Sequence, residues 1–198
     1  MKKIILFATA IVLAATQLLA VEITSQQKAT AAAGRLQLEM RKRLIPSIQK
    51  NGLIGSMDIC TKDAPALIAD LEKTFNLTMK RTALRVRNPA NNPDGTETVF
   101  LEKLAGMLKA GEQLPQEVTL FSETESGKIR TLRFYKPLFM QAVCVGCHGS
   151  ADKIPSDVAK VLATRYPKDK GAGYKDGELR GIISVTVKEI IPENEVKK

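Results

Sequence analysis

Residues 144–148 of this 198-residue chain read CVGCH, and His148 is the only histidine in the sequence. Two thiols three residues apart, followed directly by a histidine, are the attachment signature of c-type haem. On a helix, Cys144 and Cys147 lie about one turn apart, so both sulfurs can reach the two vinyl groups on one porphyrin edge. His148 then projects towards the iron. The motif predicts one covalent haem c with His148 as an iron ligand.

Two other chemistries use the same residue types. A redox disulfide between Cys144 and Cys147 is typical of thioredoxin-like domains, but these carry the motif after their first strand, near the start of the domain. A zinc site needs a fourth ligand, which Cys60, the third cysteine of the chain, can supply. The late position of CVGCH, after a predicted hairpin, argues against the thioredoxin-like disulfide, and the attachment signature itself favours haem over both alternatives. A single histidine also excludes a bis-His haem within one chain.

Residues 1–20 have the pattern of a secretory signal. Two lysines precede an apolar run from Ile4 to Leu19, and Ala20 stands at the expected cleavage position. An uncleaved membrane anchor is the alternative, because an apolar run of about 17 residues is just long enough to span a bilayer. In both cases we expect residues 21–198 to form a single domain in the periplasm, the side of the membrane on which c-type haem is attached.

The chain is basic, with a formal net charge of +9 that falls to +7 when Lys2 and Lys3 leave with the signal. The basic residues are interspersed with Asp and Glu, and no aromatic residues alternate with them, which argues against nucleic acid as a partner. We expect a solvated basic face. Docking to an acidic redox partner is the alternative.

Hydrophobic periodicity predicts an α+β fold, with helices first and antiparallel strands later. Helices are expected over residues 24–50, 53–75, 96–111 and 156–165. Pro46 is expected to end or kink the first helix, and Asn51-Gly52 to break the chain after it. Strands are expected over residues 117–122, 128–136 and 181–188, the first two as a hairpin with a turn at 124–127. Turn-rich or loop structure is expected over residues 76–97 and 168–178.

The second axial ligand of the iron has to be another residue type, because the chain has no second histidine. Cys60 is an unpaired thiol, which is unusual in an oxidising compartment. It lies on the apolar stripe of a predicted helix, where a buried structural cysteine is the ordinary alternative. The competing methionines are Met57, Met79, Met107 and Met140. Composition alone leaves the choice between cysteine and methionine open.

Four stretches resemble a family of periplasmic or membrane-anchored single-haem c-type domains with a PAS-like fold. They are Asp58-Ile59-Cys60 with Ala64-Pro65, the segment RTALRVRNPANNPD from Arg81 to Asp94, Phe134 to Leu138 leading into CVGCHG, and Gly173 to Gly181 leading into the last predicted strand. The resemblance covers residues 30–190. It implies a PAS-like antiparallel sheet with long N-terminal helices packed against it.

The resemblance also implies that Cys60 is the second iron ligand, opposite His148, and that the domain senses redox state or a small gas and passes the signal to another, unidentified redox or signalling protein. A thiolate stabilises ferric iron, so release of Cys60 on reduction would open a ferrous site to a gas. A soluble periplasmic electron-transfer cytochrome c is the alternative. We expect no enzyme, because the chain has no second histidine to act as a distal base.

Three further side chains are expected around the haem. Arg87 belongs to the family signature and is the favoured partner of the propionates, ahead of Arg81 and Arg85, because bidentate Arg–carboxylate pairs are strong. Tyr135 and Phe134 alternate faces of a strand, so one of them is expected to pack on the porphyrin, and we favour Tyr135. An ordinary core aromatic is the alternative.

Overall fold

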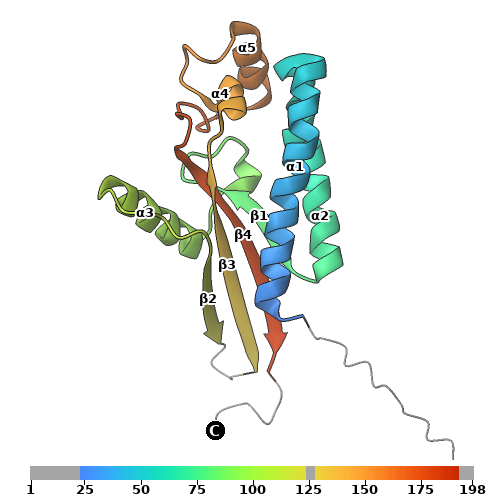
Figure 1. Ribbon diagram of the computed structural model, residues 1–198, viewed down its shortest axis with the longest axis vertical. Coiled ribbons are helices and arrows are strands. Elements are labelled where there is room, and N and C mark those ends of the chain that lie inside the picture. Colours follow the sequence, from blue (N-terminus) through green and yellow to red (C-terminus); the bar gives the residue numbers. More distant parts are fainter. Residues whose placement is uncertain (1–22, 124–127, 192–198) are drawn as a thin grey trace, which may run out of the picture.

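The computed structural model describes residues 23–123 and 128–191. The predicted export segment, residues 1–20, and the predicted turn at 124–127 lie outside these ranges. Within them the chain forms a four-stranded antiparallel sheet with helices against it (Figure 1), which confirms the α+β class. None of the helices in these ranges is long and apolar enough to cross a membrane.

The sheet has the strand order β1-β4-β3-β2, with the two longest strands in the centre. The strands are β1 (Thr78–Thr82), β2 (Val118–Glu123), β3 (Ile129–Phe139) and β4 (Leu179–Ile190). β4 is rich in β-branched residues, which favour extended backbone, and its Val185 lies opposite Phe134 of β3. β2, β3 and β4 confirm the three predicted strands, and β2 pairs with β3 as expected.

The helices described are α1 (Ser25–Gly55), α2 (Ala64–Phe75), α3 (Gly95–Lys109), α4 (Ala142–His148) and α5 (Ser156–Arg165). α1 and α3 each begin with a capping box, formed by Thr24 with Gln27 and by Asp94 with Glu97. Each box satisfies two backbone N–H groups that would otherwise lack partners. After β3 the chain forms α4 and α5 at one end of the sheet and then returns as β4 (Figure 1).

Strand alternation gives the sheet a core on each face. Phe134 is fully buried with the residues of α1 and α2, while the next residue, Tyr135, is fully buried with those of α3. α1 contributes the small residues Ala29, Ala32 and Ala33 to its core, all without exposed surface. These alanines let the long helix approach α2 and the sheet closely. The predicted packing of N-terminal helices on the sheet is confirmed.

The first helix differs from its prediction, because α1 continues through Pro46 to Gly55. Pro46 has no N–H to donate to the carbonyl of Lys42. Both residues are exposed, so water can replace that donor. The helix is interrupted at Gly52, whose φ of 68° is outside the helical region, and this confirms the predicted break at Asn51-Gly52. The chain then makes a π-turn, η1 (Ile59–Asp63), before α2 begins. The helix predicted over residues 53–75 is therefore split.

Strand β1 lies inside the segment 76–97, for which turn-rich structure is the prediction. It pairs antiparallel with β4 at one edge of the sheet. Its sequence, TMKRT, buries Met79 and Thr82 and leaves the charged residues between them partly exposed. Two adjacent charges in a five-residue strand hide the alternation that identifies longer strands. The strand positions Arg81 next to the candidate site.

Candidate functional site

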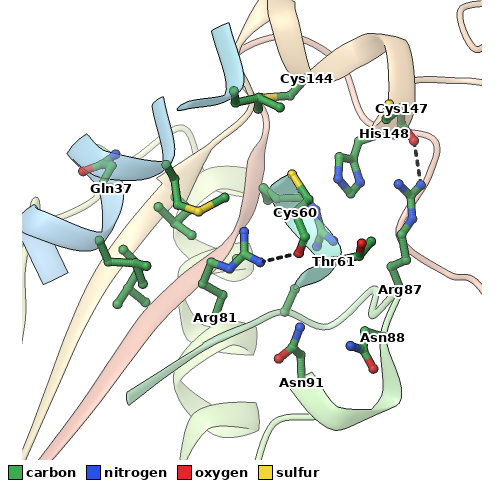
Figure 2. A pocket seen from close by; sticks show the side chains of 18 of the residues that line it. Gln37, Cys60, Thr61, Arg81, Arg87, Asn88, Asn91, Cys144, Cys147 and His148 are labelled. Atoms are coloured by element: carbon green, nitrogen blue, oxygen red, sulfur yellow. Dashed lines mark hydrogen bonds between the residues drawn. The ribbon is translucent and has the colours of Figure 1, made fainter. Parts of the chain in front are cut away.

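A cavity of about 470 Å³ lies between α1, η1, β1 and α4. This volume is within the range of cofactor pockets in proteins. The cavity brings together Cys60, Cys144, Cys147 and His148 from two distant parts of the sequence (Figure 2). Its walls are largely aliphatic and include Leu36, Met40, Leu44, Ile68, Met79 and Leu138. An apolar wall with a few grouped polar side chains is typical of a site for a cofactor or another small organic molecule.

The CVGCH motif forms most of the short helix α4. Gly146 lets this helix approach the end of α1, because a Cβ at this position would lie 2.7 Å from the Leu53 side chain. Cys144 and Cys147 are both partly exposed to the cavity. Burial raises the pKa of each thiol, so both are protonated at neutral pH. The helix therefore offers two neutral thiols on the wall that also carries His148.

His148 is fixed in one orientation by the backbone of a distant loop. Its Nδ1 lies 2.6 Å from the carbonyl oxygen of Gly171. A carbonyl oxygen can only accept, so Nδ1 carries the proton and Nε2 keeps its lone pair. Burial, assisted by the positive charges of Arg87 and Arg180, lowers the pKa of His148 to about 3. The imidazole is therefore neutral and able to bind a metal through Nε2.

Arg87 holds this loop and the motif helix together. Its Nε donates to Asp169 at 2.8 Å, and its Nη2 donates to the carbonyl oxygen of Cys147 at 2.6 Å. Asp169 in turn accepts from the N–H of Gly171 at 2.6 Å. Arg87 does line the cavity, as the predicted propionate partner should. Its Nε and Nη2, however, both donate to the protein, so the structure gives Arg87 a task in shaping the site.

Cys60 reaches the cavity from the π-turn η1, opposite the motif helix (Figure 2). Its carbonyl oxygen accepts a hydrogen bond from Nη2 of Arg81 at 3.2 Å. The competing thioethers of Met57, Met79 and Met140 also line the cavity, and so does that of Met40, which the sequence did not single out. Geometry alone leaves these methionines as candidates. The remaining candidate, Met107, packs with the α3 core on the other face of the sheet.

The charged residues that line the cavity are mostly cationic. Glu72 is acidic. The five basic residues are Arg41, Lys80, Arg81, Arg87 and Arg180. The sequence did not single out Arg180, whose burial lowers its pKa and whose Nη1 donates to the carbonyl oxygen of Arg85 at 3.1 Å. Its place just before Gly181 in the last family stretch was the available signal. Such a lining suits an occupant that carries carboxylates.

The structure does not bring Tyr135 to the cavity. Its ring stacks on Phe100 with a centroid distance of 4.5 Å, on the sheet face covered by α3. Phe134 points to the correct face but is enclosed in the α1–α2 core and does not line the cavity. The end of β3 contributes Leu138 and Phe139 instead. The alternation of side chains along a strand predicts which face of the sheet each residue lies on. It does not predict how far along the strand the site lies.

The donor set fits haem c. The cavity offers two thiols spaced for thioether bonds, an imidazole with a free Nε2, an opposing thiol, aliphatic walls and cationic side chains for propionates. All three cysteines are free thiols. Over the described part of the chain, no three His, Cys, Asp or Glu side chains converge as a site for a bare metal ion. The residues proposed for the zinc alternative share a cavity without forming such a group.

Two comparisons with known proteins bear on the fold. The sequence model of a family described as Tll0287-like matches residues 8–188. The structure is also similar to the crystal structure of the cyanobacterial heme-protein Tll0287, with a TM-score of 0.62 and 18% sequence identity over 83% of this chain and 95% of that chain. This likeness confirms the predicted PAS-like α+β fold. Among curated proteins, none matches the sequence.

Proposed function

The chain belongs to the Tll0287-like family, and on that premise we propose that it is a monohaem c-type cytochrome that reports redox state or a small gas. His148 and Cys60 are the proposed iron ligands. The observation that carries the proposal is the meeting of the CVGCH helix and Cys60 on one largely apolar cavity. The structural neighbour, whose title calls it a heme-protein, supports the same cofactor.

Attachment is the task proposed for Cys144 and Cys147. Each thiol S–H would add across one vinyl C=C bond, forming a thioether with no leaving group. The short helix α4 holds the two thiols on one wall of the cavity, and the Gly171 carbonyl turns the imidazole of His148 so that Nε2 is free. Because c-type attachment takes place outside the cytoplasm, we propose a periplasmic location, with residues 1–20 as the export signal.

Haem supplies a redox-active iron that can bind a small gas when one axial position is open. A thiolate binds ferric iron more strongly than ferrous iron, so we expect Cys60 to leave the iron on reduction. Its position supports this role, because it lies on a π-turn, a local geometry that occurs frequently at functional sites. Two coordination states would give an unidentified signalling or redox protein two surfaces to distinguish.

An electron carrier is the second candidate, and the net charge favours it. Residues 21–198 carry a net charge of +7 once the two signal lysines are removed, which suits docking to an acidic redox partner. A carrier, however, would keep the same ligands in both oxidation states. We propose no enzymatic activity for either candidate.

Addition of carbon monoxide to the reduced protein separates the two functions. A sensor that releases Cys60 on reduction should bind carbon monoxide rapidly, and its spectrum should change from that of a five-coordinate ferrous haem to that of a carbon monoxide complex. The Cys60→Ala variant provides the reference spectrum for a site without that ligand. A reduced protein that does not react with carbon monoxide, but exchanges electrons quickly with a periplasmic reductase, would contradict sensing and support the carrier.

A further inference from the structure

The carbonyl oxygen of Cys60 has lost both of its regular helical donors. In an α-turn its donor would be the N–H of Ala64, but that group bonds to the carbonyl of Ile59 instead. In a π-turn its donor would be residue 65, which is Pro65 and has no N–H. The π-turn and the proline together leave this carbonyl dependent on a partner from elsewhere in the fold.

Arg81 provides that partner from a rigid part of the molecule. Its Nη2 donates to the Cys60 carbonyl at 3.2 Å. Its own backbone is held in β1, where it pairs with Ile183 of β4. The next residue, Thr82, fixes the strand further by donating from its hydroxyl to the carbonyl of Asn91 at 2.8 Å. Arg81 therefore ties the segment that carries Cys60 to the sheet.

One N–H donor of the same guanidinium is not used within the described part of the chain. Nε of Arg81 is buried and has no hydrogen-bond partner among the described residues, although the side chain lines the cavity. A buried N–H without an acceptor is unfavourable, so a polar group in the cavity's occupant would stabilise it. An arginine with one N–H on the ligand-bearing turn and another free can contact both Cys60 and a carboxylate of the occupant.

We propose that Arg81 is a positioning residue that holds Cys60 in place for iron ligation, and that its free Nε–H binds a carboxylate of the bound haem. This inference rests on the proposed His148/Cys60 ligation. It differs from the expectation for Arg87, whose Nε and Nη2 are both engaged by the protein. The forked guanidinium is required, because a lysine ammonium has the charge but cannot make two directed bonds from one plane.

A simple charge effect makes the opposite prediction for the midpoint potential. If Arg81 acted only as a cation near the iron, removing it would favour the ferric state and lower the potential. Thiolate ligation lowers the midpoint potential. If Arg81 positions Cys60, removing Arg81 weakens that ligation, so the potential should rise. The sign of the shift therefore separates positioning from electrostatics.

The test compares Arg81→Gln, Arg81→Lys and Cys60→Ala in the exported holoprotein, with equal haem loading checked on a haem-stained denaturing gel. Ferric absorption spectra and midpoint potentials are the readouts. Both Arg81 variants should lose part of the low-spin ferric signal and shift the potential upward, in the direction of Cys60→Ala. Arg85→Gln is the matched control, because Arg85 bonds Glu178 and the Gly173 carbonyl and does not line the cavity.

Three results would overturn the inference. Wild-type spectra in both Arg81 variants would remove the positioning role. A lowered potential in Arg81→Gln, with wild-type behaviour in Arg81→Lys, would assign Arg81 a charge effect only. A wild-type spectrum in Cys60→Ala would reject the proposed ligation itself, whatever the Arg81 variants show. If Arg81→Gln yields no folded protein, Arg81→Lys alone tests the positioning role: partial loss of the low-spin signal with a raised potential supports it, and wild-type behaviour rejects it.

Discussion

The imidazole Nδ1 of His148 lies 2.6 Å from the carbonyl oxygen of Gly171, a residue 23 positions further along the chain. The contact sets the tautomer and the orientation of the only histidine. It is held in place by Arg87 and Asp169, which bind the loop on one side and the motif helix on the other. The geometry of the proposed proximal ligand thus depends on a loop outside the CVGCH motif.

Substitution of Gly171 should disturb that ligand without removing it. A Cβ at this position would lie 2.8 Å from Cβ of Arg87, so Gly171→Ala should displace the loop and its carbonyl oxygen. A weaker hydrogen bond makes the imidazole less basic, and the midpoint potential should rise. Gly34→Ala is the control, because a Cβ there meets nothing within 4 Å. Equal potentials in Gly171→Ala and wild type would show that this contact does not tune the site.

Covalent attachment should depend on both thiols of α4. A haem-stained denaturing gel of the exported protein should show a band for wild type, which the double substitution Cys144→Ala/Cys147→Ala should abolish. Cys60→Ala removes a thiol from the same cavity and should keep the band, because Cys60 is proposed to bind the iron and not the porphyrin edge. Haem that is extracted from wild type by acidified acetone would contradict the attachment.

Asp94 should make stability depend on pH. Burial alone would raise the pKa of Asp94, but the hydrogen bonds from the Glu97 N–H and from Arg133, 2.7 Å away, lower it below 3.8. The ionised carboxylate therefore stabilises the fold above about pH 4, and this contribution is lost as the pH falls through the lowered pKa. Asp94→Asn keeps a good N-cap but removes the ion pair.

Urea unfolding at two pH values measures that contribution. At pH 7 the free energy of unfolding of wild type should exceed that of Asp94→Asn by at most about 1 kcal/mol, because the ion pair is partly exposed to solvent. At pH 3 the two proteins should approach the same stability. A difference that stays constant between the two pH values would show that the carboxylate's charge is not the cause.

Local patterns were enough to predict much of the architecture. The capped helix at α3, the short helix α5 and the β-branched strand β4 were all predicted near their observed positions, because propensity and periodicity agree there. The strand β1 was missed, since tertiary pairing with β4 stabilises a sequence with little strand character of its own.

The candidate site was predictable where its chemistry lies in one short motif or in a stretch that resembles the family, as for Cys60 and Arg87, which both line the cavity. The motif identified Cys144, Cys147 and His148 directly. The partners of these residues are backbone groups and arginines from distant segments, as in the Arg87–Asp169 pair, whose members are 82 residues apart. No local pattern specifies which carbonyl oxygen will accept from a buried histidine, and none placed Tyr135 under α3 instead of at the cavity.

The ferric spectrum of Cys60→Ala, compared with wild type and with substitutions of the rival methionines, tests the iron ligation most directly. Wild type should show a low-spin thiolate-type spectrum and a potential below that of a His/Met cytochrome. Cys60→Ala should become high-spin or recruit a new ligand, with a higher potential. A methionine–iron absorption band in wild type that persists in Cys60→Ala, and disappears when one of the methionines on the cavity wall (Met40, Met57, Met79 or Met140) is replaced by alanine, would contradict the proposed ligand set.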